Sequence, residues 1–245
     1  MDHSSASMVG LGLMTLAAWG KGPTANAAVV TFDNGQEGWH GPQGTGGSSF
    51  IDAADGNPAS SYRTVFNNFG IDFINSTNPD FVGDFTTSSA LDLTVDVRAR
   101  QVEFFFQPVS RSFIVEFRSS SLAQGTPYPW VSVWYEIGVL QSGLDWTTWS
   151  VSIPDTNSAT LPAGWGGSGD EDPNTFEPRL PPGITFRDVL ANTDTLALST
   201  FVPGFFFGFT DFDVSIDNVT LNRVPTPASA MLLGLGGATA FRRRR

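Results

Sequence analysis

Apolar and polar side chains alternate with a period of two along much of this chain, and that alternation limits the fold more than any other feature. Between residues 91 and 98, leucine or valine occupies every odd position, while aspartate, threonine or arginine occupies every even one. Successive side chains of a β-strand point to opposite faces, so the pattern predicts a strand with one dry face and one solvated face. Residues 113–118, 131–137 and 149–153 repeat it. Clusters of Gly, Pro, Asn and Ser separate these short strands, which predicts an all-β, antiparallel β-sandwich of the jelly-roll type.

Two aromatic segments carry further expectations about the strands. Val102, Phe104 and Phe106 continue the alternation, so we expect that strand to reach Phe106 and the hairpin turn to occupy residues 107–112, where Pro108 lies. The run 205–207 consists of three phenylalanines, which are aromatic on both faces. That run predicts a segment that is buried on both sides.

Only one segment between residues 28 and 227 favours a helix, and the last strand requires an irregularity. Thr185 can cap a helix of one or two turns over 186–191, whose apolar residues follow helical spacing. In the last strand, residues 212–221, the apolar positions change parity at Asp217-Asn218. A change of parity within one strand predicts a β-bulge at these two residues.

The composition of the segment between residues 28 and 227 excludes several classes of function. It carries 23 acidic residues, eight arginines and no lysine, a formal charge of −15. Such a surface repels nucleic acid and anionic membranes and attracts divalent cations. The chain has no cysteine, so its stability has to rest on an apolar core rather than on disulfides. Twenty phenylalanines supply that core, at about 1.5–3 kcal/mol for each fully buried ring.

The N-terminus has the pattern of an export signal. Residues 8–19 form an apolar run of the length of a signal-peptide core, and Ala25-Asn26-Ala27 is a small-x-small cleavage site. We therefore expect residues 1–27 to be a signal peptide. Asp2 stands where a signal usually carries a basic residue, which favours a start codon further upstream.

The C-terminus, residues 224–245, has the pattern of a sorting tail. Val224, Pro225, Thr226 and Pro227 are followed by the uncharged run 228–241 and then by Arg242, Arg243, Arg244 and Arg245. The prolines end any preceding strand, because proline has no N–H for a ladder. Fourteen helical residues span about 21 Å, which is short of the ~30 Å hydrocarbon core of a bilayer. The tail thus predicts a transient membrane segment with its arginines on the cytoplasmic side, and residues 28–223 remain as one β-sandwich domain.

This order of parts resembles the PEP-CTERM tail of exported bacterial proteins. The resemblance implies processing by the membrane protease-transpeptidase exosortase. Thr226 stands where the family has glutamate in its Pro-Glu-Pro motif.

Short segments of the body resemble known β-sandwich families. The opening Phe32-Asp33-Asn34-Gly35 with Gly38-Trp39 resembles bacterial carbohydrate-binding and jelly-roll domains. Three later segments are similar, in order, to the laminin domain IV (laminin B) family: Pro79-Asp80-Phe81-Val82-Gly83-Asp84, residues 186–191, and Ile216-Asp217-Asn218-Val219-Thr220-Leu221. That family's Tyr-Gly-Gly turn is replaced by residues 86–90. The resemblance implies the fold and no single function, because this fold carries many unrelated roles.

The sequence favours a non-enzymatic protein. Between residues 28 and 227 the only histidine is His40, so neither a Ser-His-Asp site nor a transition-metal site is indicated, and His40 is expected to be a loop residue. Glu103, Glu116 and Glu136 lie on predicted strands, as catalytic acids of glycosidases can. Their alternation with apolar neighbours favours a solvated outer face instead. A glycoside hydrolase or lyase is a remote alternative.

A structural calcium ion is one possible cofactor. Asp33 and Asn34 lie near the start of the body, and Asp217 lies in the last strand. Carboxylates and carbonyls of this kind bind calcium and could tie the first strand to the last. The alternative is that Asp33-Asn34-Gly35 forms a simple turn.

Four tryptophans are candidate platforms for a sugar ring. Trp165 is the first choice, because glycines flank it within the long irregular stretch 154–183; the alternative is that it folds back over the sandwich. Trp130 and Trp134 share one strand face, and Trp39 is the fourth. The sequence thus predicts an exported cell-surface or extracellular-matrix protein, associated with exopolysaccharide. The alternative function is a carbohydrate-binding module that uses exposed tryptophans.

Overall fold

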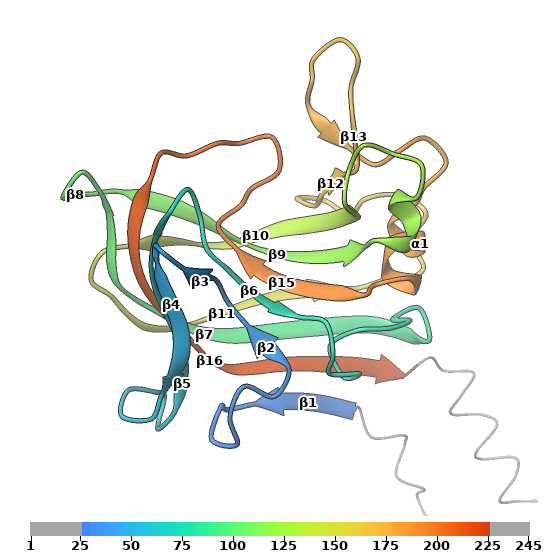
Figure 1. The fold of residues 1–245 in the computed structure, drawn as a ribbon. Coiled ribbons are helices and arrows are strands. Elements are labelled where there is room, and N and C mark those ends of the chain that lie inside the picture. The colour runs from blue at the N-terminus through green and yellow to red at the C-terminus, as the bar shows by residue number, and fades with distance from the viewer. Residues whose placement is uncertain (1–25, 226–245) are drawn as a thin grey trace, which may run out of the picture.

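The computed structural model describes residues 26–225, which form two antiparallel sheets stacked as a β-sandwich (Figure 1). The predicted all-β sandwich with one short helix is therefore confirmed. Residues 1–25 of the predicted signal and residues 226–245 of the predicted sorting tail lie outside the described residues, and so does the expected apolar helix over 228–241. Within residues 26–225, no helix is long and apolar enough to cross a membrane.

The eight-stranded sheet has the central order β11-β7-β16-β5-β4-β3, with β1 paired to β16 and β8 paired to β7. Its strands are β1 (Asn26–Val30), β3 (Gln43–Gly44), β4 (Gly47–Asp52), β5 (Ser61–Asn68), β7 (Ser88–Phe104), β8 (Gln107–Pro108), β11 (Leu144–Ile153) and β16 (Thr210–Pro225). The predicted domain boundaries at residues 28 and 223 fall inside β1 and β16, which pair with each other from Asn26↔Arg223 to Val30↔Val219.

The six-stranded sheet has the order β12-β10-β9-β15-β6-β2. Its strands are β2 (Trp39–His40), β6 (Asp72–Asn75), β9 (Ser110–Ser119), β10 (Val131–Gln141), β12 (Gly166–Ser168) and β15 (Thr195–Ser199). A small hairpin, β13 (Asp170–Glu171) with β14 (Pro178–Arg179), projects from this side of the sandwich (Figure 1). A 3₁₀ turn, η1 (Ser121–Ala123), follows β9.

The core lies between the two sheets and follows the predicted alternation. Leu91, Leu93, Val95 and Val97 of β7 are all at most 2% exposed, as are Phe113, Val115 and Phe117 of β9. Ten of the fully buried side chains are aromatic: Phe32, Trp39, Tyr62, Phe73, Phe81, Phe85, Phe113, Phe117, Phe186 and Phe212. Aromatic burial thus replaces disulfides as the main source of stability, as the composition predicted.

The single helix, α1 (Phe186–Ala191), forms as predicted. Thr185 accepts a hydrogen bond from the backbone N–H of Asp188, and the Asp188 carboxylate accepts one from the N–H of Thr185. This reciprocal capping box satisfies two donors that a helix start otherwise leaves unpaired. The helix buries Phe186, Val189 and Leu190 against the sandwich.

The predicted bulge in β16 is confirmed, whereas the predicted hairpin turn after β7 is wrong. The pairing of β16 with β7 shifts register between Asp217 and Thr220. The turn after β7 occupies Phe105 and Phe106 rather than residues 107–112, because Glu103 and Phe104 pair directly with Pro108 and Gln107. Phe105 and Phe106 have φ values of +48° and +62°, which two-residue hairpin turns require and which Asn and Gly adopt most readily.

Candidate ligand-binding groove

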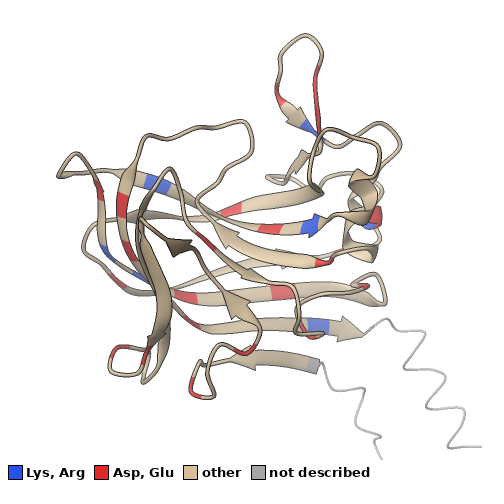
Figure 2. Ribbon diagram, in the orientation of Figure 1, with Lys and Arg blue, Asp and Glu red and all other residues tan. Residues whose placement is uncertain are grey.

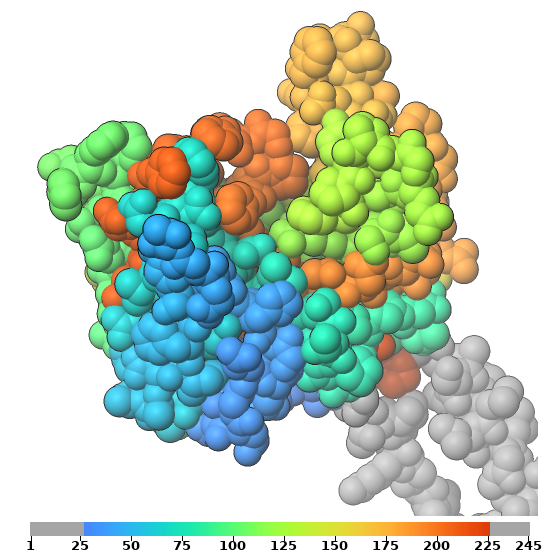
Figure 3. All heavy atoms as spheres, viewed as in Figure 1, coloured from blue at the N-terminus to red at the C-terminus, as the bar shows by residue number. Residues whose placement is uncertain are grey.

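A groove crosses the outer face of the six-stranded sheet. Its central hollow, of about 260 Å³, lies between the loop that follows β15 and the segment that precedes β10. In Figure 3 the groove opens between the orange atoms of the 200–209 loop and the lime atoms of residues 120–130. The hollow is lined by Glu116, Arg118, Tyr128, Pro129, Trp130, Ser168, Gly169, Asp170, Glu171, Pro178, Phe201, Val202, Pro203 and Gly204.

The floor of the groove comes from strand parity. Phe113, Val115 and Phe117 of β9 point into the core, so Glu116 and Arg118 point outward. β10 pairs antiparallel with β9, and Trp134↔Glu116 and Ser132↔Arg118 are opposite each other. This register places the outward residues just before and within β10 beside Glu116.

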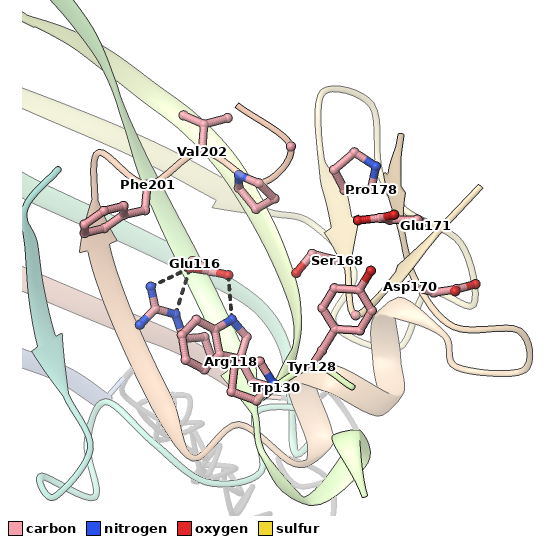
Figure 4. Close-up of a pocket in the computed structure, with 14 residues that line it drawn as sticks. Glu116, Arg118, Tyr128, Trp130, Ser168, Asp170, Glu171, Pro178, Phe201 and Val202 are labelled. Atoms are coloured by element: carbon pink, nitrogen blue, oxygen red, sulfur yellow. Dashed lines mark hydrogen bonds and ion pairs between the residues drawn. The ribbon is translucent and has the colours of Figure 1, made fainter. Parts of the chain in front are cut away.

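Trp130 is held by a hydrogen-bonded ion pair beneath it (Figure 4). Its indole Nε1 donates a hydrogen bond to Glu116 Oε1 at 3.2 Å, and Arg118 Nε donates to Glu116 Oε2 at 2.7 Å. The guanidinium of Arg118 stacks on the indole, 4.3 Å from the ring centroid. Glu116 is only 2% exposed, and the hydroxyl of Ser132 also donates to its Oε1. The ring is therefore fixed by a charge-assisted network rather than by shape alone.

Arg118 lies between two carboxylates. Its Nη1 is 3.7 Å from Asp72 Oδ2 on β6, which lies beyond β15 in the sheet. Burial raises the pKa of Asp72 above its usual range, although the positive charge of Arg118 opposes that rise. One arginine between two acids leaves the floor with an excess of negative charge.

The wall on the hairpin side adds more acid. Asp170 and Glu171 of β13 lie beside Tyr128 (Figure 4). Burial raises the pKa of the Tyr128 hydroxyl, and the neighbouring Glu171 and Asp170 raise it further. Arg179 of β14 donates to Asp170 at 2.9 Å and to Asp172 at 3.3 Å, which holds the hairpin closed.

Two further hollows adjoin the central one. One, of about 360 Å³, shares Arg118 and Trp130 with the central hollow and is also lined by His40, Ser76 and Asp194. The other, of about 650 Å³, shares Tyr128, Gly169, Asp170 and Glu171 with the central hollow. The two outer hollows share no residue with each other, so each adjoins the central hollow separately, and Trp130 lines both the central hollow and the one that His40 lines.

The four tryptophans predicted as sugar-binding platforms lie in different environments. Trp130 lines the groove. Trp134 is half-buried on the same face, as predicted, and its indole lies over Gly166 of β12, where a Cβ would come within 2.4 Å of the ring. Trp134 does not line any of the three hollows.

The expectation that Trp165 and Trp39 are exposed platforms is wrong. Trp39 is 1% exposed and packs edge-to-face on Phe81, while Trp165 is 8% exposed and packs between Tyr135 and Phe186. Gly164, which precedes Trp165, adopts a φ of +83°. A glycine takes this conformation without strain, and the chain can therefore turn the Trp165 indole into the core.

The residues that sequence reasoning missed are Arg118, Tyr128 and the loop 201–204. Arg118 has the same parity as Glu116, so pairing the two predicted strands could have placed it beside Trp130. Glu116 is buried, which corrects the expectation of a solvated face, whereas Glu136 is exposed and Glu103 half-exposed. His40 is exposed, and it lies in β2 rather than in a loop.

The residues of the calcium prediction lie in two different environments. Within residues 26–225, no three His, Cys, Asp or Glu side chains are placed to hold a metal ion. Asp33 and Asn34 form an exposed turn. Asp217 is 1% exposed, and its two oxygens accept 2.6 Å hydrogen bonds from the backbone N–H groups of Asn57 and Asn218.

Asp217 instead belongs to a pair of carboxylates bridged by amides. It lies opposite Asp96 of β7, and the side chains of Asn57 and Asn218 both donate to Asp96 Oδ2. Burial raises the pKa of Asp217 to about 6, and the charges of Asp96 and Asp33 add to that rise. These hydrogen bonds join the 57–58 turn to β16 and β7, and they do not join the first strand to the last as the calcium ion was expected to do.

Acidic residues dominate the surface as the composition predicted, and arginines neutralise part of them. Figure 2 shows acidic residues spread over both sheets and few basic ones. On the eight-stranded sheet, Arg63 bonds Asp213 at 2.6 Å and Asp52 at 2.9 Å, and Arg100 reaches Asp213 at 3.3 Å. Asp213 of β16 is therefore ion-paired with two arginines on this face.

Comparison with known proteins yields no family. No protein-family model matches the chain, and no curated protein matches it. The exosortase and laminin IV resemblances therefore stay predictions.

Among solved structures, the chain is similar to the family 11 carbohydrate-binding module of a cellulosomal cellulase of Clostridium thermocellum, at 12% identity and a TM-score of 0.47 over 83% of this chain and 96% of that one. It is similar to the CBM22-1 xylan-binding domain of a Paenibacillus barcinonensis protein, at 12% identity and a TM-score of 0.44 over 82% and 97%. A Clostridium thermocellum xylanase structure in complex with xylohexaose matches at 12% identity and a TM-score of 0.43; the match covers 80% of this chain and only 28% of that one. Similarities this distant do not extend to function.

Proposed function

We propose that this protein binds neutral polysaccharide chains without cleaving them, in the groove on the six-stranded sheet. The observation that carries the proposal is the Trp130 ring, which is fixed by Glu116 and Arg118 and lines two adjoining hollows. A rigid aromatic plane suits the C–H face of a sugar ring, and its fixation lowers the entropy lost on binding.

The polar groups around Trp130 supply the contacts that sugar hydroxyls need. Tyr128 and Ser168 offer hydroxyls, and Asp170 and Glu171 offer acceptors within the same hollow. A mostly apolar hollow with a few placed polar groups is the usual form of a small-ligand site. Three adjoining hollows favour a chain of several sugars over a monosaccharide.

The charge of the groove favours a neutral ligand. Glu116, Asp170 and Glu171 outnumber the one arginine of the central hollow. Uronic-acid polymers would bring further negative charge to this site and to a body of charge −15.

The bonding of Glu116 favours binding over hydrolysis. Both of its oxygens already accept hydrogen bonds from protein donors, from Trp130 and Ser132 on one and from Arg118 on the other. A general acid needs a free proton at the glycosidic oxygen, and a nucleophile needs a free lone pair. Glu116 is therefore better suited to orient Trp130.

Affinity electrophoresis against a panel of polysaccharides tests this function. We expect retardation by neutral polymers such as xylan or mixed-linkage glucan, none by polygalacturonate or alginate, and no release of reducing sugar. Retardation by the acidic polymers alone, or release of reducing sugar, contradicts the proposal.

We also propose that the chain is exported and sorted through residues 224–245, so that this binding takes place at the cell surface or in an exopolysaccharide matrix. The pairing of β1 with the end of β16 supports this, because both ends leave the sandwich at the eight-stranded sheet, away from the groove (Figure 1). Fractionation of cells that express the chain with and without residues 226–245 tests it. Identical distribution of both forms contradicts sorting.

A further inference from the structure

A cluster of phenylalanines projects from one end of the sandwich, at the end where β16 begins. It is formed by two loops that carry no charged residue, one between Glu103 and Arg111 and one between Asp194 and Asp211, together with the end of β5. We call it the aromatic tip, and its members are Phe69, Phe104, Phe105, Phe106, Phe205, Phe206, Phe207 and Phe209.

The two loops form one continuous surface. The Phe69 ring lies 4.8 Å from that of Phe206 and 4.0 Å from that of Phe209. A Cβ on Gly208 would come within 2.5 Å of the Phe104 ring, so the second loop lies directly against the first. Arg111 stacks on Phe207 at 4.5 Å and turns that ring inward. The remaining rings are left at the outside.

The outer rings of the tip face solvent, which overturns the expectation that residues 205–207 are buried. Phe105 is 77% exposed, Phe106 83%, Phe205 63% and Phe206 77%. Exposed apolar patches of this kind usually mark an interaction site. In Figure 3 the green and orange loops protrude at the upper left of the molecule, so the tip is convex.

The backbone conformation of the tip indicates that its phenylalanines are present for a function and not for stability. Phe105 and Phe106 both have positive φ, a conformation that strains residues with a side chain. Phe105 packs edge-to-face on Phe104 at 4.6 Å, but most of the rings of Phe105 and Phe106 stays exposed. A turn of this geometry is more stable with Asn-Gly, so stability does not explain Phe-Phe here.

We propose that the aromatic tip inserts into the surface of a lipid bilayer with uncharged or zwitterionic headgroups. The loops bring no charge that would have to be desolvated in the membrane interface. Phenylalanine rings on a convex surface enter lipid readily, and they have no polar group to leave unpaired there. The acidic body repels anionic lipids, and we therefore expect the tip to prefer lipids with neutral headgroups.

Two other occupants fit the tip less well. A polysaccharide site needs hydroxyl or amide partners beside its aromatic rings, and between residues 104 and 107 only Gln107 offers one. A second copy of the chain would need a matching concavity, and two bodies of charge −15 repel each other.

The tip is distinct from the C-terminal tail. β16 begins with Thr210 beside the tip and ends with Pro225, so sixteen residues, or roughly 50 Å of strand, separate the tip from residue 226. A label at the tip therefore reports insertion of the tip and not of the tail.

Site-specific fluorescence in the full chain tests the proposal, because the chain has no cysteine of its own. Phe106→Cys and Phe206→Cys would each carry an environment-sensitive fluorophore. The control is Phe176→Cys, since Phe176 is 72% exposed between β13 and β14. With phosphatidylcholine vesicles we expect blue-shifted, brighter emission at 106 and 206 and none at 176, and a weaker change when half the lipid is phosphatidylglycerol. An unchanged spectrum at 106 and 206, or an equal shift at 176, overturns insertion.

A turn-repairing variant separates insertion from folding. Phe105→Asn with Phe106→Gly suits the positive φ values, so we expect a thermal midpoint at least as high as that of the wild type. Its affinity for phosphatidylcholine vesicles should fall by about tenfold or more. Unchanged vesicle affinity contradicts the proposal. In the labelled variants, a blue shift that appears without lipid and grows with protein concentration would show that the tip binds a second copy of the chain instead. A blue shift that appears only when polysaccharide is added would show that the tip belongs to the polysaccharide site.

Discussion

The guanidinium of Arg118 lies over the indole of Trp130, with its central carbon 4.3 Å from the ring centroid. Both side chains also donate hydrogen bonds to the same carboxylate, that of Glu116. A cation stacked on tryptophan contributes about 0.5–2 kcal/mol, and more as it is desolvated. Three side chains from two strands thus act as one unit, and the orientation of Trp130 depends on all of them.

Glu116→Gln should destabilise the fold. It leaves the guanidinium of Arg118, which is 95% buried, with Asp72 at 3.7 Å as its nearest carboxylate. Removing one partner of a buried ion pair costs about 3–5 kcal/mol. Glu136→Gln is the matched control, because Glu136 lies on the neighbouring strand β10 and is exposed. We expect it to change the free energy of unfolding by no more than ~0.5 kcal/mol. Urea denaturation measures both, and equal effects would show that the Glu116 network does not stabilise the fold.

Trp165→Ala should act on stability rather than on ligand binding. The indole packs between Tyr135 and Phe186 in the core, and removal of a buried aromatic side chain costs about 3–5 kcal/mol. At a temperature where the variant is still folded, its affinity for polysaccharide should equal that of the wild type. If the variant is stable but no longer binds polysaccharide, Trp165 belongs to the ligand site and the prediction is wrong.

The buried carboxylate of Asp217 predicts that stability rises on mild acidification. Its pKa is about 6 in the folded protein against 3.8 in the unfolded chain, so the folded state holds the proton more tightly between these values. Stability therefore falls as pH rises through this window, and the full penalty, up to about 3 kcal/mol, is present above pH 6. We expect a higher thermal midpoint at pH 5 than at pH 7.

Two variants separate this effect from general charge repulsion. Asp217→Asn should flatten the dependence of the thermal midpoint on pH. Asp211→Asn, on the same strand, removes the same charge from a half-exposed position and should leave the dependence intact. Equal slopes for the two variants would show that Asp217 is not the titrating group.

The end of β16 predicts where the C-terminal segment can be removed. Val224 and Pro225 pair with Ala90 and Ser88, and the Ser89 hydroxyl donates to both of their carbonyls, at 3.2 and 3.3 Å. A chain that stops after Pro225 should keep the stability of the full chain. A chain that stops after Arg223 should lose about 1 kcal/mol with these bonds. Thermal unfolding of both truncations checks this, and equal midpoints would contradict the pairing.

Sequence patterns predicted the features that depend on neighbours along the chain. Alternation placed Phe113, Val115 and Phe117 in the core, the capping residue Thr185 located α1, and the change of parity at Asp217 located the bulge. Each of these rests on a local rule, either the two-residue period of a strand or the geometry of a helix start.

Features that depend on long-range contacts were beyond sequence patterns. Parity has no meaning in a loop, so it could not show that Trp165 turns inward while Phe206 turns outward. The backbone partner of Asp217, Asn57, lies 160 residues away. The floor of the groove could have been predicted, because Glu116 and Trp130 lie on adjacent predicted strands. The wall of the groove comes from the loop 201–204, and no sequence pattern predicted its position there.

Calorimetric titration with a neutral polysaccharide tests the central claim most directly, using Trp130→Ala and Trp146→Ala. Trp146 is a half-exposed tryptophan on β11 of the other sheet, and it lines none of the three groove hollows. We predict that Trp130→Ala weakens binding by about tenfold or more, since the stacking plane is lost. Trp146→Ala should bind within about twofold of the wild type, as expected for a surface change away from the site. Wild-type affinity in Trp130→Ala, with the variant folded by circular dichroism, would contradict the account.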